Sequence, residues 1–105
     1  MPGPSRREQL ERLLADDPKD PFLRYGLAME HGSEGNQERL VGVLSDLLTD
    51  LPDYIPAYFQ CAQGLLRLGR AEEAKRVLVR GVEQATASGE AHAAEEMQGL
   101  LMTLE

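Results

Sequence analysis

A repeat of 34 residues is the strongest constraint on the fold of this chain. When the 105-residue sequence is shifted against itself by 34 positions, Leu10 aligns with Leu44 and Leu78, and Gly35 aligns with Gly69. Further aligned pairs are Leu13 with Leu47, Leu14 with Leu48, Pro18 with Pro52, and Glu38 with Glu72. The leucines within one copy follow helical spacing, so each copy carries the apolar face of a helix. A repeat of this length predicts a stack of helical units in which each unit covers its neighbour.

Residues that start and stop helices agree with the repeat. Ser5 and Glu8 form a capping box, Asp20 precedes Pro21 at a first helical position, and Asn36 is a further N-cap. Glycine-containing loops end helices at residues 32–35, at 69 and at 88–89. We therefore predict helices over about 5–16, 21–31, 36–51, 53–68 (opened by Asp53) and 71–87, with a last helix after residue 89.

The second copy reads Tyr58-x2-Cys61-Ala62-x2-Leu65, followed by Ala74-x3-Leu78, and the first reads Arg24-x2-Leu27-Ala28-x2-His31, followed by Leu40-x3-Leu44 and Pro52. This pattern resembles the tetratricopeptide repeat, whose consensus is W-x2-L-G-x2-Y, then an alanine, a large apolar residue and a closing proline. Arg24 and His31 depart from it at large aromatic positions, Leu40 departs at a small position, and Thr86 replaces the second closing proline. The resemblance covers about residues 18–86.

The resemblance implies an all-α fold, a tetratricopeptide-type solenoid of about six antiparallel helices. We expect one domain over residues 1–105, with an N-terminal helix in 1–17, repeat one in 18–51, repeat two in 52–87 and a C-terminal capping helix in 88–105. Met97 and Leu101 belong to the apolar stripe of the last helix, which does not keep the 34-residue register. Glutamates beside this stripe suit a cap that is polar outside, so we expect a small, closed stack.

In the resembling family, the first helix of each repeat lines a concave groove that holds a peptide or a partner helix. Carried over by register, the expected groove residues are Phe22, Tyr25, Met29, Phe59, Gln60, Gln63 and Arg67. Aromatic residues and methionine are favoured at interfaces. The alternative is that these side chains form a second core beneath the terminal helices. Arg67 is the one cation in the set, so a clamp for the carboxylate tail of a chaperone is not expected.

The predicted function is a protein–protein interaction or scaffold module that binds another protein or peptide of unknown identity. The alternative is a self-associating module, a homodimer whose groove is occupied by a second copy of the chain. We predict no enzyme activity and no cofactor, because the sequence contains no glycine-rich phosphate loop and no combination of acid, base or nucleophile that suggests a reaction.

Composition narrows the classes of partner and compartment. The net charge of −7 argues against nucleic-acid binding, which depends on lysine and arginine neutralising phosphates. The apolar runs are far shorter than the roughly 18 residues of a membrane span, so no membrane partner is expected. Arg6 and Arg7 are not followed by the apolar run of a secretory signal, which predicts a cytoplasmic protein. Cys61 is the single cysteine and takes the place of a packed leucine, so we interpret it as a buried apolar residue.

We assign no function to the two histidines or to the charged residues of 72–80. His31 and His92 each lie near glutamates, but they are far apart in sequence and have no cysteine partners, so no metal site is predicted. Glu72 and Glu73 precede Arg76 and Arg80 at a spacing that predicts ion pairs between successive turns of a solvated helix face.

Overall fold

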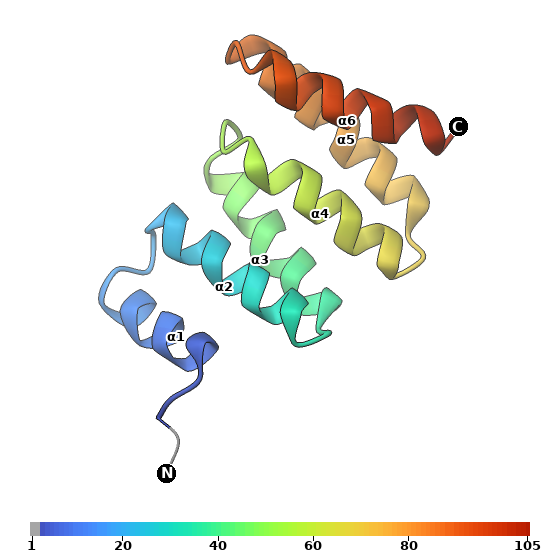
Figure 1. The fold of residues 1–105 in the computed structure, drawn as a ribbon. Coiled ribbons are helices and arrows are strands. Elements are labelled where there is room, and N and C mark those ends of the chain that lie inside the picture. Colours follow the sequence, from blue (N-terminus) through green and yellow to red (C-terminus); the bar gives the residue numbers. More distant parts are fainter. Residues whose placement is uncertain (1–2) are drawn as a thin grey trace.

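The computed structural model describes residues 3–105, and in this range the chain forms six α-helices (Figure 1). They are α1 (Arg6–Asp16), α2 (Pro21–Ser33), α3 (Gln37–Asp50), α4 (Pro56–Arg67), α5 (Ala71–Ala87) and α6 (Ala91–Thr103). The prediction of an all-α stack of about six helices is confirmed. No helix within the described range is long and apolar enough to cross a membrane.

Each helix packs against the next one along the chain. The α2–α3 and α4–α5 pairs correspond to the two sequence copies, α1 packs on α2, and α6 packs on α5. The stack is elongated, with extents of 48 × 28 × 20 Å. In Figure 1, α2, α4 and α6 lie in front of the fainter α3 and α5, so the molecule has an α2/α4/α6 face and an α3/α5 face.

The polar residues at three helix starts make the hydrogen bonds that the sequence predicts. Ser5 Oγ accepts a bond from the Glu8 amide at 3.1 Å, and the Glu8 carboxylate accepts one from the Ser5 amide at 3.2 Å. Asp20 accepts from the amide of Leu23 at 3.1 Å, and the Asn36 side chain caps α3 in the same way. These bonds satisfy amide groups that have no partner inside the helix.

The predicted start of α4 at Asp53 is wrong, because the helix begins at Pro56. Residues 51–55 form a turn instead, in which the amide of Tyr54 donates to the carbonyl of Leu51 at 3.1 Å and the amide of Ile55 donates to that of Asp53 at 2.9 Å. The carbonyl of Pro52 in this turn accepts a 2.6 Å hydrogen bond from the Tyr58 hydroxyl. Pro56 occupies the first helical position, where its missing donor costs nothing. The expected loop at residues 32–35 is also shorter, since α2 continues to Ser33.

Gly35 and Gly69 end α2 and α4 in the left-handed conformation, with φ of 81° and 74°. The amide after each glycine bonds back to the helix: Asn36 N lies 2.8 Å from the His31 carbonyl oxygen. Gly89 repeats the arrangement at the end of α5, with φ of 74°. A side chain would be strained at this φ, so the repeated glycine is required by the tight turn.

The core runs continuously through α2 to α6 and includes most of the apolar positions that the repeat aligned. Ala28, Ala62 and Ala74 are fully buried where paired helices approach closely. At the end of the stack, Met97 and Leu101 of α6 are buried as well. They follow Cys61 and Leu65 of α4 by 36 residues (97 − 61 and 101 − 65) and not by 34. The α6 helix thus packs like the first helix of a further repeat, shifted by two residues.

Candidate functional site

A hollow of about 190 Å³ lies on the α2/α4/α6 face, where these three helices meet. It is lined by Tyr25, Ile55, Pro56, Phe59, Gln60, Ala93, Glu96 and Met97. We refer to it as the Tyr25–Phe59 hollow. Its lining combines two aromatic rings, aliphatic and thioether groups, one amide and one carboxylate.

An aromatic pair forms the α2 side of this hollow. The ring of Tyr25 lies 5.8 Å from the ring of Tyr54, with the planes tilted by 57°. This geometry is favourable because the positive edge of one ring faces the negative face of the other. The amide of Tyr54 donates to the carbonyl of Leu51 at 3.1 Å, which fixes the turn that carries the second ring. Burial, together with the neighbouring Tyr54, raises the pKa of Tyr25, so its hydroxyl stays neutral near pH 7.

The floor of the hollow is part of the apolar core. Ile55 is 7% exposed and Met97 is 1% exposed, while Phe59 is half-buried and packs against them from α4. Met97 reaches this position because Gly81 of α5 has no side chain, and a Cβ there would lie 2.6 Å from the Met97 sulfur. The hollow therefore has a rigid apolar base whose shape depends on the docking of α6.

The rim is polar and carries negative charge. Gln60 is half-buried and presents an amide, and Glu96 is exposed on α6. The Glu96 carboxylate lies 3.9 Å from the ring nitrogen of His92, a loose contact on the solvent side. An apolar side chain can thus enter the hollow while a neighbouring amide or cationic group meets the rim.

The structure divides the seven residues expected in the groove. Tyr25, Phe59 and Gln60 line the hollow together. Phe22 is 76% exposed and lies outside its lining, and Arg67 is exposed near the end of α4. Two further residues, Met29 and Gln63, are half-buried and also lie outside the lining. Tyr25 and Phe59 pack against the core and also line an open hollow, so they combine the groove and second-core interpretations.

Five residues of this region were not expected in the groove from the sequence: Tyr54, Ile55, Ala93, Glu96 and Met97. Tyr54 and Ile55 belong to the turn before α4. The sequence analysis assigned both residues to the helix itself. Glu96 and Met97 belong to α6, which was interpreted as a polar cap outside the repeat. The 36-residue spacing from Cys61 to Met97 was the available signal.

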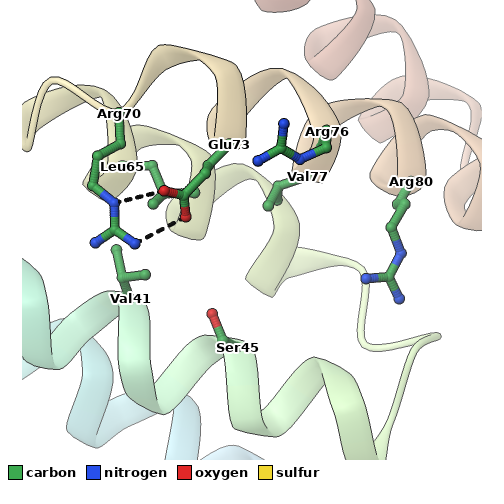
Figure 2. A pocket seen from close by; sticks show the side chains of 8 residues that line it. All are labelled: Val41, Ser45, Leu65, Arg70, Glu73, Arg76, Val77 and Arg80. Carbon is green, nitrogen blue, oxygen red and sulfur yellow. Dashed lines mark hydrogen bonds and ion pairs between the residues drawn. The ribbon is translucent and has the colours of Figure 1, made fainter.

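A second hollow of about 320 Å³ lies on the α3/α5 face. Figure 2 shows its lining residues, which are Val41, Ser45, Leu65, Arg70, Glu73, Arg76, Val77 and Arg80. Both carboxylate oxygens of Glu73 accept hydrogen bonds of 2.9 Å from Arg70. This bidentate pair holds the pKa of Glu73 below its usual value.

The predicted pairing of Glu72 and Glu73 with Arg76 and Arg80 is wrong. Glu73 pairs with Arg70 one turn earlier, and Glu72 lies 3.6 Å from Lys75. Both oxygens of Glu73 are bonded to the fork of Arg70. Within residues 3–105, Arg76 and Arg80 consequently make no ion pair.

Cys61 is 1% exposed, and its burial raises the pKa of the thiol, which lies 3.8 Å from the Ser45 hydroxyl. A buried thiol with a raised pKa is a poor nucleophile. In the described part of the chain, no group of three or more His, Cys, Asp or Glu side chains is placed to hold a metal ion.

Comparison with known proteins identifies similar solved structures. The solution structure of a tetratricopeptide repeat domain protein from Salinibacter ruber has a TM-score of 0.80 and 32% identity, with 84% of this chain and 89% of that chain covered. A crystal structure of a tetratricopeptide repeat domain protein from the same organism has a TM-score of 0.76 and 30% identity, with 81% and 94% covered. No protein-family model matches the chain, and no curated protein matches it either.

A third structure, the solution structure of a protein from Bordetella parapertussis, extends the likeness over more of the chain. Its TM-score is 0.84 at 22% identity, and the alignment covers 97% of this chain and 89% of that chain. At this identity the match speaks to the fold alone. Because it covers nearly the whole chain, the fold it supports extends beyond the two central repeats.

Proposed function

This chain belongs to the tetratricopeptide repeat family, and from that membership we propose that it is a protein-interaction module whose Tyr25–Phe59 hollow binds a peptide or helix of a partner. The observation that carries the proposal is the convergence of Tyr25, Phe59 and Met97 from three different helices on one open apolar hollow. Such a hollow fits an anchor side chain, and aromatic and methionine linings are favoured at protein interfaces.

The size of the hollow argues for a side chain as its occupant. Small-molecule sites enclose roughly 300–1,000 Å³ and bury most of their ligand. The Tyr25–Phe59 hollow, with about 190 Å³, is below this range and is open to solvent on the side of Gln60 and Glu96. A leucine or phenylalanine from a partner would fill it, while the partner backbone continues along the face.

The rim indicates the charge of the residue beside this anchor. Glu96 is exposed at the edge of the hollow, and the chain as a whole carries a net charge of −7. A lysine or arginine next to the anchor would meet the Glu96 carboxylate, and the overall charge would speed the encounter. We therefore propose an apolar anchor flanked by a basic residue as the preferred segment.

Binding to two related labelled peptides tests this proposal. In the first, leucine alternates with lysine, and in the second, glutamine replaces each lysine. Fluorescence anisotropy should show tighter binding of the lysine–leucine peptide. The variant Glu96→Lys should weaken that binding about tenfold and remove the preference between the two peptides, as expected for loss of a charge-assisted contact.

The matched control is Glu95→Lys, which makes the same charge change one residue earlier at an exposed position outside the hollow. It should retain most of the affinity and the preference for lysine. If both variants weakened binding equally, the attraction would come from the overall charge of the chain. That result would overturn the proposal that Glu96 contacts the basic residue of the partner. Failure of the wild-type chain to bind either peptide would overturn the hollow as a binding site.

Self-association is the second candidate function, and the exposed ring of Phe22 favours it. This side chain is 76% exposed on α2, outside the Tyr25–Phe59 hollow. A second copy could cover it, since interfaces between identical chains are apolar. Light scattering over a concentration series should then show a dimer that Phe22→Ala converts to the 11.6 kDa monomer. A monomer at every concentration would contradict this candidate.

A further inference from the structure

The stretch from Arg70 into the first half of α5 carries a concentration of positive charge in a chain that is acidic as a whole. Arg70, Lys75, Arg76 and Arg80 are four of the 11 cationic residues and fall within one stretch of 11 positions (70–80). The same stretch contains two acidic residues, so its net charge is +2 (4 − 2) in a chain of net charge −7. Arg76 and Arg80 have no ion-pair partner within residues 3–105, as described above.

These two arginines stand beside an apolar floor. Figure 2 shows both on α5, with Val77 below Arg76, and with Val41 and Ser45 on the facing helix α3. The hollow between the two helices has a volume of about 320 Å³, enough for more than one side chain. The carboxylate of Glu73, the one acidic group in the lining, is already bonded through both oxygens to Arg70.

We propose that this α3/α5 hollow is a second docking site, which binds an acidic segment of a partner protein. A carboxylate of the segment would accept hydrogen bonds from Arg76 and Arg80, and an adjacent apolar side chain would cover Val41 and Val77. Arginine forks bind carboxylates through paired hydrogen bonds, and an unpaired guanidinium at an apolar surface gains most from such a partner.

An acidic protein segment fits this site better than a nucleic acid does. A nucleic acid presents charge along its whole length and needs an extended basic track. Here the basic stretch is short and is interrupted by carboxylates, since Glu38 of α3 lies 3.5 Å from Arg70 and Glu72 within the stretch lies 3.6 Å from Lys75. A segment with one or two carboxylates next to an apolar residue matches both the local charge and the apolar floor.

The test uses a labelled peptide in which leucine alternates with glutamate, and a matched peptide with glutamine in place of glutamate. Fluorescence anisotropy at low salt should show that the full chain binds the glutamate–leucine peptide more tightly. The double variant Arg76→Gln/Arg80→Gln should weaken this binding about tenfold or more, because two charge-assisted hydrogen bonds are lost.

The control is Arg12→Gln/Arg39→Gln, which removes two exposed arginines that also have no ion-pair partner in the described chain and lie outside the hollow. It makes the same change in net charge and should keep the binding. In addition, circular dichroism should show that Arg76→Gln/Arg80→Gln is as helical as the original chain, so that its loss of binding cannot result from unfolding.

Three outcomes would overturn the proposal. The first is equal loss of binding in the two glutamine double variants, and the second is no binding of the glutamate–leucine peptide by the unmodified chain. The third is tighter binding of a single-stranded oligonucleotide than of the peptide, with the same dependence on Arg76 and Arg80. Because the Tyr25–Phe59 hollow is tested with the opposite peptide and different variants, either site can fail without the other.

Discussion

Arg24 and Asp50 form an ion pair of 2.9 Å at the position where the second repeat has a tyrosine hydrogen bond. Tyr58 follows Arg24 by one repeat length, and its hydroxyl donates to the carbonyl of Pro52 at 2.6 Å. Arg24 connects α2 to the last residue of α3, and Tyr58 connects α4 to the turn that precedes it. The Arg24 departure from the aromatic consensus is therefore balanced by a carboxylate on α3.

This ion pair makes stability depend on pH in a defined direction. The hydrogen bond from Arg24, together with the charge of Lys19, holds the pKa of Asp50 below its usual value. Near pH 3 the unfolded chain therefore binds more protons at this residue than the folded chain, so the free energy of unfolding falls as the pH drops below about 3.9. Well above that pH the ion pair makes its full contribution to the free energy of unfolding.

Replacing the carboxylate isolates this effect. Asp50→Asn should lower the urea midpoint at neutral pH, and its difference from the original chain should narrow at about pH 3. The control Asp46→Asn lies on the same helix, at an exposed residue that makes no ion pair in the described chain. A difference that stays constant with pH would contradict the assignment.

The hydroxyl of Tyr58 contributes to stability through its single hydrogen bond. Tyr58→Phe should lower the free energy of unfolding by about 1 kcal/mol, because the bond to Pro52 is lost while the ring remains packed. This corresponds to about 4–8 °C in the thermal midpoint of a domain of this size. Tyr54→Phe, whose hydroxyl makes no hydrogen bond within residues 3–105, should change the midpoint much less. Equal midpoints for the two variants would refute this role.

The docking of α6 depends on the absence of a side chain at Gly81. An added Cβ would lie 2.6 Å from the Met97 sulfur and 2.8 Å from Tyr58 Cβ, so Gly81→Ala should destabilise the fold by about 1–3 kcal/mol. Gly42→Ala adds the same group to an exposed helix position with nothing within 4 Å. It should stabilise the fold by about 0.5–1 kcal/mol through helix propensity. Urea unfolding of both variants checks the opposite signs.

We expect the first helix to open more easily than the others. None of its residues is buried, and its contacts with α2 include the packing of Leu10 over Gly26 and exposed ion pairs such as Arg7–Glu34 at 2.9 Å. Because salt screens exposed charges, amide hydrogen exchange in α1 should accelerate at high salt and with Arg7→Gln. The control Arg12→Gln should not accelerate it. Uniform protection across all six helices would contradict this expectation.

The sequence predicted the parts of the fold that follow from local chemistry. Gly35 and Gly69 mark turns because a left-handed φ favours glycine at any such turn, and Ser5 and Asp20 mark helix starts because they bond to amides three residues later. The expected start of α4 at Asp53 was too early, because aspartate is a favoured N-cap, whereas the helix begins at Pro56 after the turn at residues 51–55.

The two hollows were harder to predict, because they depend on how helices distant in sequence meet. Tyr25 and Phe59 followed from the register, but Met97 did not, since the buried residues of α6 do not keep the 34-residue spacing. On the other face, helical spacing predicted partners for Arg76 and Arg80. In the structure Glu73 pairs instead with Arg70, through two hydrogen bonds at the start of α5.

Two phenylalanine truncations test whether the Tyr25–Phe59 hollow is the site of recognition. Phe59 lines the hollow, whereas Phe22 lies outside it and is 76% exposed. Anisotropy titrations with the lysine–leucine peptide should show binding weakened about tenfold or more by Phe59→Ala, as for removal of a central anchor contact, and retained by Phe22→Ala. Circular dichroism should confirm that both variants remain helical. Binding that is lost with Phe22→Ala and kept with Phe59→Ala would contradict the Tyr25–Phe59 hollow as the site of recognition.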